Sequence, residues 1–223
     1  FEDSRLRWEM KSVRSTNSIF SEKLFLKDLE KLKSFYIDQR FFDIAIEHKL
    51  NKKPETGRAD VLITIIEGDR YDVSFSGNTA FGKRALEKGL DLFQSGNRYG
   101  LGLRKSVPNI EEKYHKAGYL EVSVQMDSDV AIKNNISVKK LQFIIDEGPQ
   151  AIVKKISISG NKVFSEKALK KSMLTRLPGW MHDGGYDPKK LQEDILAMDN
   201  LYHEIGYLNV QVKKTVTFSS DRE

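Results

Sequence analysis

Residues 114–124 read YHKAGYLEVSV, and residues 202–212 read YHEIGYLNVQV. A fainter third copy, YIDQRFFDIAI, occupies residues 36–46. A second signature also recurs, as VSFSGNTAF at residues 73–81 and as ISISGNKVF at residues 156–164. The copies follow one another in the same order at a period of about 80 residues, which is typical of an array of small modules. Such an array suits an extended binding scaffold better than a single-cleft enzyme.

The bulk composition agrees with such an array. The chain has 223 residues, and 37 basic against 32 acidic side chains give a net charge of +5. The two signs are interspersed, which is typical of a solvated surface, although a basic footprint for nucleic acid or anionic lipid is the alternative. The absence of cysteine excludes disulfides and cysteine-based metal sites. No stretch reaches the length of a transmembrane helix, no signal peptide opens the chain, and its abrupt ends are those expected of an excised fragment.

The second copy predicts the order of elements within one module. Residues 71–76 alternate apolar and polar side chains, which predicts a half-buried strand. A helix is predicted over residues 82–93, and a second helix ends at Gly118. Pro108 lies inside the second helical pattern, so that helix either kinks there or begins near Ser106.

Two more strands follow the second helix. They are predicted at residues 119–125 and 141–145, and they should pair antiparallel across a loop at residues 127–137. The fold class is therefore α+β, with tandem β-α-α-β-β modules that each place two helices on one face of a three-stranded mixed sheet. The first strand pairs parallel with the last, which leaves the last strand in the centre. Almost no linker separates the modules, so we expect an elongated rod.

Three modules are expected along the chain. Residues 1–69 form a partial first module whose opening strand is missing, and residues 70–150 form a complete second module. Residues 151–223 form a third module that lacks its last strand. Its other strands are expected in the second signature, from Ile156, and from Tyr207 to Phe218.

The ends of the second helix of each module also follow from the repeat. Asp187 is the expected N-cap in the third module, and Ser21 takes its place in the first. Arg40 stands where the other copies have Gly118 and Gly206. The helix end at Arg40 must therefore differ, because a left-handed C-cap costs a non-glycine residue about 1 kcal/mol.

These signatures resemble those of POTRA (polypeptide-transport-associated) domains, the periplasmic modules that precede the membrane barrel in the outer-membrane assembly and translocation porin superfamily. The matching motifs are a strand followed by Gly-Asn-x-x-Phe, a helix-ending Tyr-x-x-x-Gly-Tyr-x-x-Val, and a closing Glu-Gly at residues 67–68 and 147–148. The resemblance covers nearly the whole chain. It implies a scaffold at the periplasmic face of the bacterial outer membrane that binds partner subunits or unfolded outer-membrane proteins. A C-terminal membrane barrel is expected in the full-length protein.

The resemblance also implies a mode of binding, in which a partner adds a strand to an exposed sheet edge. The inferred strand order supports this mode, because it places the strand after Gly118 or Gly206 at an edge, whose unpaired backbone groups can bind an extended peptide of almost any sequence. The candidate partner-binding residues are Val122, Ser123, Val124, Gln125, Val210, Gln211 and Val212.

No catalytic, cofactor or metal site is predicted. There is no Walker loop, no Gly-x-Ser-x-Gly elbow and no dinucleotide fingerprint. Trp180, in a Leu-Pro-Gly-Trp loop, is either a hydrophobic plug between modules or an exposed contact. No partner at metal-ligand spacing accompanies any of the four histidines, which are His48, His115, His182 and His203.

The alternative to a protein-binding scaffold is a basic nucleic-acid-binding repeat array, because small modules of two helices and three strands also bind RNA. Such binding needs aromatic and basic residues interleaved on one sheet face, or a Gly-x-x-Gly loop flanked by bases, and the sequence supplies no such loop. We therefore expect protein partners, and neither nucleic acid nor a small-molecule substrate.

Overall fold

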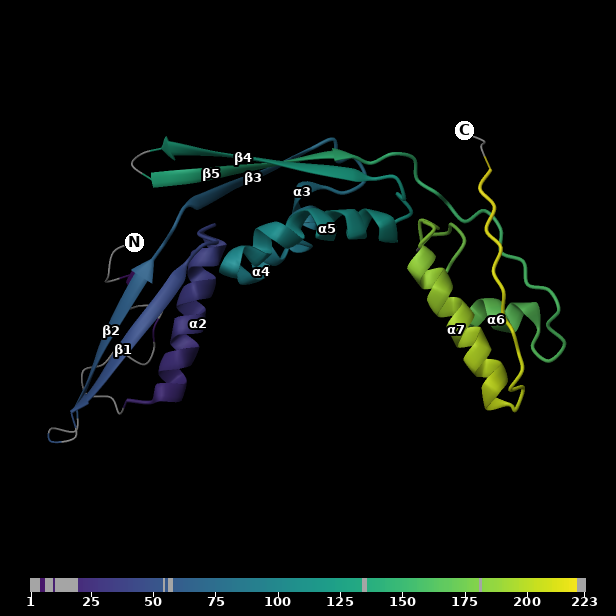
Figure 1. Cartoon of the computed structure of the whole chain (residues 1–223), viewed down its shortest axis with the longest axis horizontal. Coiled ribbons are helices and arrows are strands. Elements are labelled where there is room, and N and C mark those ends of the chain that lie inside the picture. The colour runs from purple at the N-terminus through teal and green to yellow at the C-terminus, as the bar shows by residue number, and fades with distance from the viewer. Residues whose placement is uncertain are drawn as a thin grey trace. The chain divides into compact units, whose positions relative to one another are not determined.

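The computed structural model describes residues 5–6, 10, 20–53, 55, 58–133, 136–180 and 182–219. The chain divides into two compact units, one of Phe1–Ile110 with Val124–Ile144 and one of Glu111–Ser123 with Ile145–Glu223. Figure 1 shows their elements. Over the described residues, no helix combines the length and the apolar character needed to span a membrane.

The first unit begins with a helix that packs on a hairpin. Helix α2, Glu22–Asp38, lies beside the antiparallel strands β1, Ala45–Lys53, and β2, Arg58–Ile66 (Figure 1). The Ser21 hydroxyl accepts a hydrogen bond from the backbone amide of Leu24, so the predicted N-cap is confirmed. Met10, upstream of this helix, is buried.

The first unit also contains most of a three-stranded sheet in the order β3-β5-β4. β3, Arg70–Ser76, runs parallel to β5, Ile136–Asp146. β4, Ser123–Lys133, lies on the other side of β5 and runs in the opposite direction (Figure 1). The central position of the last strand confirms the predicted topology. β4 and β5 extend through most of residues 127–137, where the sequence predicts a loop, so that prediction is wrong.

Two predicted helices differ in detail. The single helix expected over residues 82–93 is split into α3, Lys83–Lys88, and α4, Asp91–Ser95. Between them Leu90 has an extended backbone and a fully buried side chain. Burial of Leu90 therefore prevails over helix continuation next to Gly89, since glycine has a low helix propensity.

The next helix begins before Ser106, which was one of the two starts that the sequence allows. A 3₁₀ turn, η1, Arg98–Gly100, leads into α5, Leu101–Lys116. Pro108 lies inside α5, so a start near Ser106 is wrong. The Ile110 and Tyr114 side chains on α5 are fully buried.

The third module has its helices but not its strands. α6, Glu166–Ser172, and α7, Pro188–Glu204, lie in the second unit, and Asp187 caps α7 as predicted. The strands expected over residues 156–159 and 207–218 are not formed. In the second module, β3 and β4 each pair only with the central strand β5. The described residues after α7 contain no strand equivalent to β5, so the two outer segments of the third module have no ladder partner.

The unpaired segments of the third module still contact its helices. Three buried side chains, Leu169, Met173 and Met198, form its small core. Ile158 and Val212, from the two segments without ladder partners, pack against this core. Apolar alternation therefore places the side chains correctly even where no backbone ladder exists.

The second helix of each module ends in the same way. In the second module, the Gly118 amide donates to the His115 carbonyl at 3.0 Å and the Tyr119 amide donates to the Tyr114 carbonyl at 3.1 Å. This pair of bonds is the Schellman motif, which needs a left-handed residue after the helix. The same two bonds end the second helix of the first and third modules.

Arg40 adopts this left-handed conformation although it is not glycine. Its φ is 70°, so the expectation that the helix must end differently there is wrong. The Arg40 guanidinium donates to Glu87 at 3.2 Å and lies 5.4 Å from the centre of the Phe93 ring. These contacts with the following module offset a backbone cost of about 1 kcal/mol.

A sheet edge as the candidate protein-binding site

The predicted site residues of the second module lie at one edge of its sheet. Ser123, Val124 and Gln125 are in β4, and Val122 directly precedes that strand. Val122 and Val124 are each 8% exposed, whereas the two polar side chains are exposed. The alternation read from the sequence is therefore real, and it fixes the apolar side chains in the module and leaves the backbone of β4 along the edge.

The opposite edge of the sheet, β3, is already occupied. The backbone amide of Tyr71 donates to the Arg40 carbonyl at 2.8 Å, and the Lys83 ammonium donates to the Val73 carbonyl at 2.9 Å. Since residues of like parity in a strand direct their backbone groups to the same side, both bonds lie on the side of β3 away from β5. No strand among the described residues lies beyond β4, so β4 is the more open edge.

The far half of β4 carries a feature that sequence reasoning missed. Val130 is 56% exposed and Ile132 is 82% exposed, and both belong to the segment predicted as a loop. Ile136, at the start of β5, is 41% exposed. The signal was present in the sequence, because apolar residues alternate on both sides of Asn134-Asn135, a pair suited to a turn. An exposed apolar stripe beside an open backbone edge suits an extended peptide with alternating side chains.

The second set of predicted site residues does not form an edge strand. Val210, Gln211 and Val212 lie outside any strand, because the central strand they would pair with is not among the described residues. Gln211 is exposed and Val212 contacts the core of the third module. The expected strand is therefore corrected, and a role for these residues in partner binding stays a prediction.

Both junctions between consecutive modules use the same backbone bond. A backbone amide at the start of the next module donates to the carbonyl of the left-handed residue, from Tyr71 to Arg40 and from Ala151 to Gly118, each at 2.8 Å. At the second junction the Gln150 side chain also donates to the Ala117 carbonyl at 2.8 Å. The start of each following module is thus fixed to the end of the preceding helix.

The ionisable groups at these junctions are structural. Burial, reinforced by a hydrogen bond to Asp43 at 2.6 Å, raises the pKa of Tyr71. Burial and a hydrogen bond to Glu147 at 2.7 Å raise the pKa of Tyr114 in the same way. Both phenols therefore remain protonated as donors, which is the opposite of what a nucleophile or a base needs.

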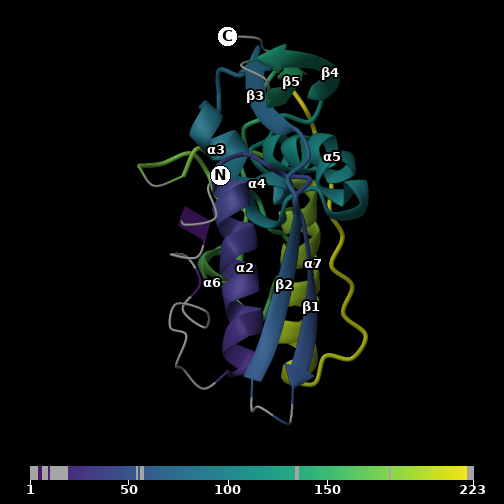
Figure 2. The same ribbon diagram turned by 90° about the vertical axis from the view of Figure 1, so that its left-hand side faces the viewer.

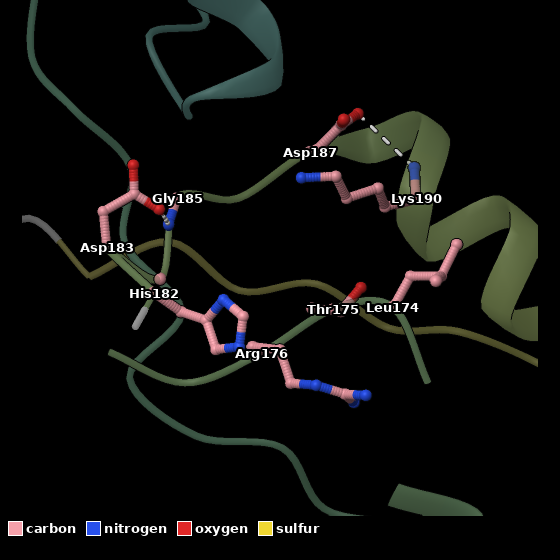
Figure 3. Close-up of a pocket in the computed structure, with 9 residues that line it drawn as sticks. Leu174, Thr175, Arg176, His182, Asp183, Gly185, Asp187 and Lys190 are labelled. Atoms are coloured by element: carbon pink, nitrogen blue, oxygen red, sulfur yellow. Dashed lines mark hydrogen bonds between the residues drawn. The ribbon is translucent and has the colours of Figure 1, made fainter. Parts of the chain in front are cut away.

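Figure 3 shows a small pocket beside the start of α7. Its volume is about 50 Å³, which holds one or two water molecules and is far below the roughly 300 Å³ of a small-molecule site. The buried Thr175 hydroxyl has no hydrogen-bond partner among the described residues, and a water molecule would satisfy it. The pocket is lined by Leu174, Thr175, Arg176, His182, Asp183, Gly184, Gly185, Asp187 and Lys190.

The histidines and acidic residues do not gather into a metal site within the described part of the chain. The ring of His48 packs edge-on against Phe25, with 5.3 Å between ring centres. His203 lies 4.0 Å from Asp199, one turn earlier on α7. Both are contacts within a module.

Comparison with protein-family models identifies one family over nearly the whole chain. The POTRA model, described as a surface antigen variable number repeat, matches residues 1–68, 71–148 and 151–223. A putative outer membrane protein assembly factor of Treponema pallidum is 28% identical over 134 residues, which are 58% of this chain and 16% of that protein. The outer membrane protein assembly factor BamA of Neisseria meningitidis serogroup B is 28% identical over 183 residues, 78% of this chain and 22% of BamA.

The chain thus spans about a fifth of the length of these curated relatives. Among solved structures, Haemophilus influenzae BamA POTRA3-5 aligns over 90% of this chain and 80% of that one, with 19% sequence identity and a TM-score of 0.37.

Proposed function

The chain belongs to the POTRA family of surface antigen repeats, and from this premise we propose that it is a protein-binding scaffold of an outer-membrane protein assembly or translocation factor. The relatives are named for outer-membrane protein assembly. We place the chain at the periplasmic face of the bacterial outer membrane, with protein partners such as unfolded outer-membrane proteins or periplasmic subunits. The boundaries of its three modules are proposed as 1–69, 70–150 and 151–223.

The observation that carries the binding mode is the difference between the two edges of the second module's sheet. Two outer backbone groups of β3, the Tyr71 amide and the Val73 carbonyl, are bonded to Arg40 and Lys83, whereas β4 has no neighbouring strand on its outer side among the described residues. An incoming extended segment would therefore pair with β4. Its apolar side chains would meet Val130 and Ile132 on the same strand.

A backbone-directed site suits diverse clients. Strands of outer-membrane barrels alternate apolar and polar side chains, so they share a pattern rather than a sequence. The backbone edge of β4 recognises the extended conformation itself, and the exposed stripe tolerates any apolar side chain at every second position. This site requires no cofactor and no catalytic group.

The test is a titration of the full chain with a synthetic peptide of alternating apolar and polar residues, followed by backbone amide NMR. Strand addition predicts shifts concentrated in β4, including Ser123 to Lys133, with little change in α3 or α5. The Ser123→Pro variant removes one backbone donor at the first residue of the strand, where proline is tolerated. Peptide affinity should fall about fivefold, the equivalent of one hydrogen bond of about 1 kcal/mol.

Ser123→Ala is the matched control, because it removes the hydroxyl but keeps the amide. It should bind the peptide as the parent chain does, and both variants should keep the parent's unfolding midpoint. Shifts confined to the helices, or equal affinities for the proline and alanine variants, would reject β4 as the receiving edge.

A further inference from the structure

Trp180 stands at the tip of a tight loop in the third module. The Gly179 amide donates to the His182 carbonyl at 2.8 Å, and the His182 amide donates back to the Gly179 carbonyl at 3.2 Å. These two bonds close the loop around Trp180, whose side chain is 100% exposed. Figure 2 shows the yellow-green loop between α6 and α7 projecting away from both helices. Nothing in the described part of the chain covers the indole, as an exposed contact requires.

The loop is held at its base rather than hanging free. The buried carboxylate of Asp194, on α7, accepts the backbone amides of Leu174 and Thr175, the second at 3.0 Å. Arg176 donates through its guanidinium to the carbonyls of Lys170 and Lys171 at the end of α6, at 3.2 and 3.4 Å. The start of the loop is thus tied to both helices of the module.

The returning side of the loop is equally constrained. Gly184 has a φ of 75°, and a side chain there would meet the Pro178 ring at 2.5 Å, so the two sides of the loop touch. The Gly184 carbonyl accepts the Val153 amide at 2.9 Å. An indole displayed on a constrained loop loses little conformational freedom when it binds, which favours binding.

Three cationic side chains lie on the segments that lead into and out of this loop, with Lys171 near the end of α6, Arg176 after it and Lys190 in the first turn of α7. Lys171 and Lys190 are exposed, and Arg176 is half-buried. None of the three forms an ion pair with a carboxylate among the described residues, whereas the neighbouring Lys170 is paired with Glu166. Figure 3 shows Arg176 and Lys190 among the residues that line the pocket, together with His182 and Asp183 of the loop.

The carboxylates near the loop are hydrogen-bonded within the module, and two apolar side chains beside the tip are exposed. Asp183 and Asp187 accept backbone amides of Gly185 and of the first turn of α7, so they are engaged within the module. Leu174 is 54% exposed and Leu177 is 44% exposed, which adds apolar surface next to the tip.

We propose that the tip of this loop docks on an anionic phospholipid surface, with the Trp180 indole at the level of the headgroups and the ammonium and guanidinium groups of Lys171, Lys190 and Arg176 on lipid phosphates. Tryptophan is enriched at membrane–water interfaces because its ring is apolar at one end and a donor at the other. The charge of the three cations complements anionic lipid. A protein hot spot is instead ringed by packed side chains, and a lone convex tip lacks that ring.

Tryptophan emission of the full chain with lipid vesicles tests this proposal. The sequence contains one other tryptophan, Trp8, so the Trp8→Phe variant makes Trp180 the only indole. Its emission should shift to the blue with vesicles of phosphatidylcholine and phosphatidylglycerol, and not with phosphatidylcholine alone. Added salt should reverse the shift, since screening weakens the charge contribution. Co-sedimentation of the parent chain with the anionic vesicles should be lost in Trp180→Ala.

The charge contribution has its own matched pair of variants. Lys171→Gln with Lys190→Gln should weaken binding to anionic vesicles about 25-fold, roughly fivefold for each cation near an anionic surface. Lys27→Gln with Lys49→Gln removes the same charge from exposed positions on α2 and β1, and it should leave binding near the parent value. Trp180→Ala should retain the unfolding midpoint, because its side chain makes no buried contact.

Three outcomes overturn the proposal. One is an unshifted emission with both kinds of vesicle. Another is equal sedimentation of the parent chain and Trp180→Ala. The third is a cross-link from a photoreactive residue at position 179 to a protein in an outer-membrane extract, lost when Trp180→Ala is added, without any vesicle binding, which would assign the tip to a protein contact.

Discussion

The Tyr114 hydroxyl donates a hydrogen bond of 2.7 Å to a carboxylate oxygen of Glu147, and Tyr36 donates to Glu67 in the same way at 3.0 Å. The tyrosine opens the helix-ending signature of its module and the glutamate belongs to the closing Glu-Gly. Two motifs that are more than 30 residues apart in the sequence are therefore joined by a hydrogen bond between their own side chains. The bond ties the end of the second helix to the end of the last strand.

Removing this hydroxyl should destabilise the chain. Tyr114→Phe keeps the buried ring but leaves the Glu147 carboxylate without this donor, so the free energy of unfolding should fall by about 1–3 kcal/mol, the value of a hydrogen bond to a charged group. The matched control is Tyr202→Phe, since Tyr202 has no such glutamate partner among the described residues and contacts the Phe164 ring at 5.1 Å instead. Urea unfolding of both variants measures the difference, and equal losses would contradict this role for the bond.

Alkaline pH should weaken the fold through the same phenols. Burial, followed by hydrogen bonds to Asp43 and Glu147, raises the pKa of Tyr71 and Tyr114 above the ordinary value of about 10. The folded chain thus holds these protons more tightly than the unfolded chain, so their stabilisation is complete below about pH 10 and declines as the pH rises further. Unfolding midpoints measured from pH 8 upward should fall above about pH 10, and less steeply in Tyr114→Phe. An identical decline in that variant would count against the assignment.

Gly118 and Gly206 form a natural matched pair for the second junction. Both are left-handed, with φ of 93° and 92°, so alanine costs each about 1 kcal/mol of backbone strain. A side chain at Gly118 would meet the Ala151 carbonyl oxygen at 2.5 Å, whereas a side chain at Gly206 meets nothing within 4 Å. Gly118→Ala should therefore cost about 1–3 kcal/mol more than Gly206→Ala, the range for an overpacked site. Thermal or urea unfolding measures the two free-energy costs. Equal costs would mean that the backbone near Ala151 moves to accommodate the added side chain at position 118.

The arrangement of the modules as an elongated rod stays a prediction. It rests on the near absence of linker residues between modules, at 67–71 and 147–151. Small-angle scattering of the full chain should give the long-tailed distance distribution of a rod. A distribution typical of a sphere, or of freely moving beads, would reject it.

The sequence predicted the features that depend on local chemistry and on simple topology. The caps at Ser21 and Asp187 were readable because a side-chain acceptor precedes an apolar helical stripe. The central place of β5 followed from the order of elements and the need to bury both helices on one face.

Features that depend on tertiary contacts could not be predicted from local sequence. The left-handed Arg40 is stabilised by Glu87 and Phe93, which lie far along the chain, so local propensity alone gave the wrong answer. The break at Leu90 depends on complete burial of its side chain. At the candidate edge, the alternation predicts Val122 to Gln125, but polar residues that are typical of a loop obscure the exposed stripe at Val130 and Ile132.

The central position of β5 has a consequence for the order in which a module folds. Arg70 of β3 pairs with Val138 of β5, about 70 residues later, so the first strand has no ladder partner until the rest of the module has been made. Closing so long a loop is slow compared with forming the local contacts of α3, α4 and α5, which can form first. Pairing of β5 with β3 and β4 is then the step that joins the two ends of the module and completes its sheet.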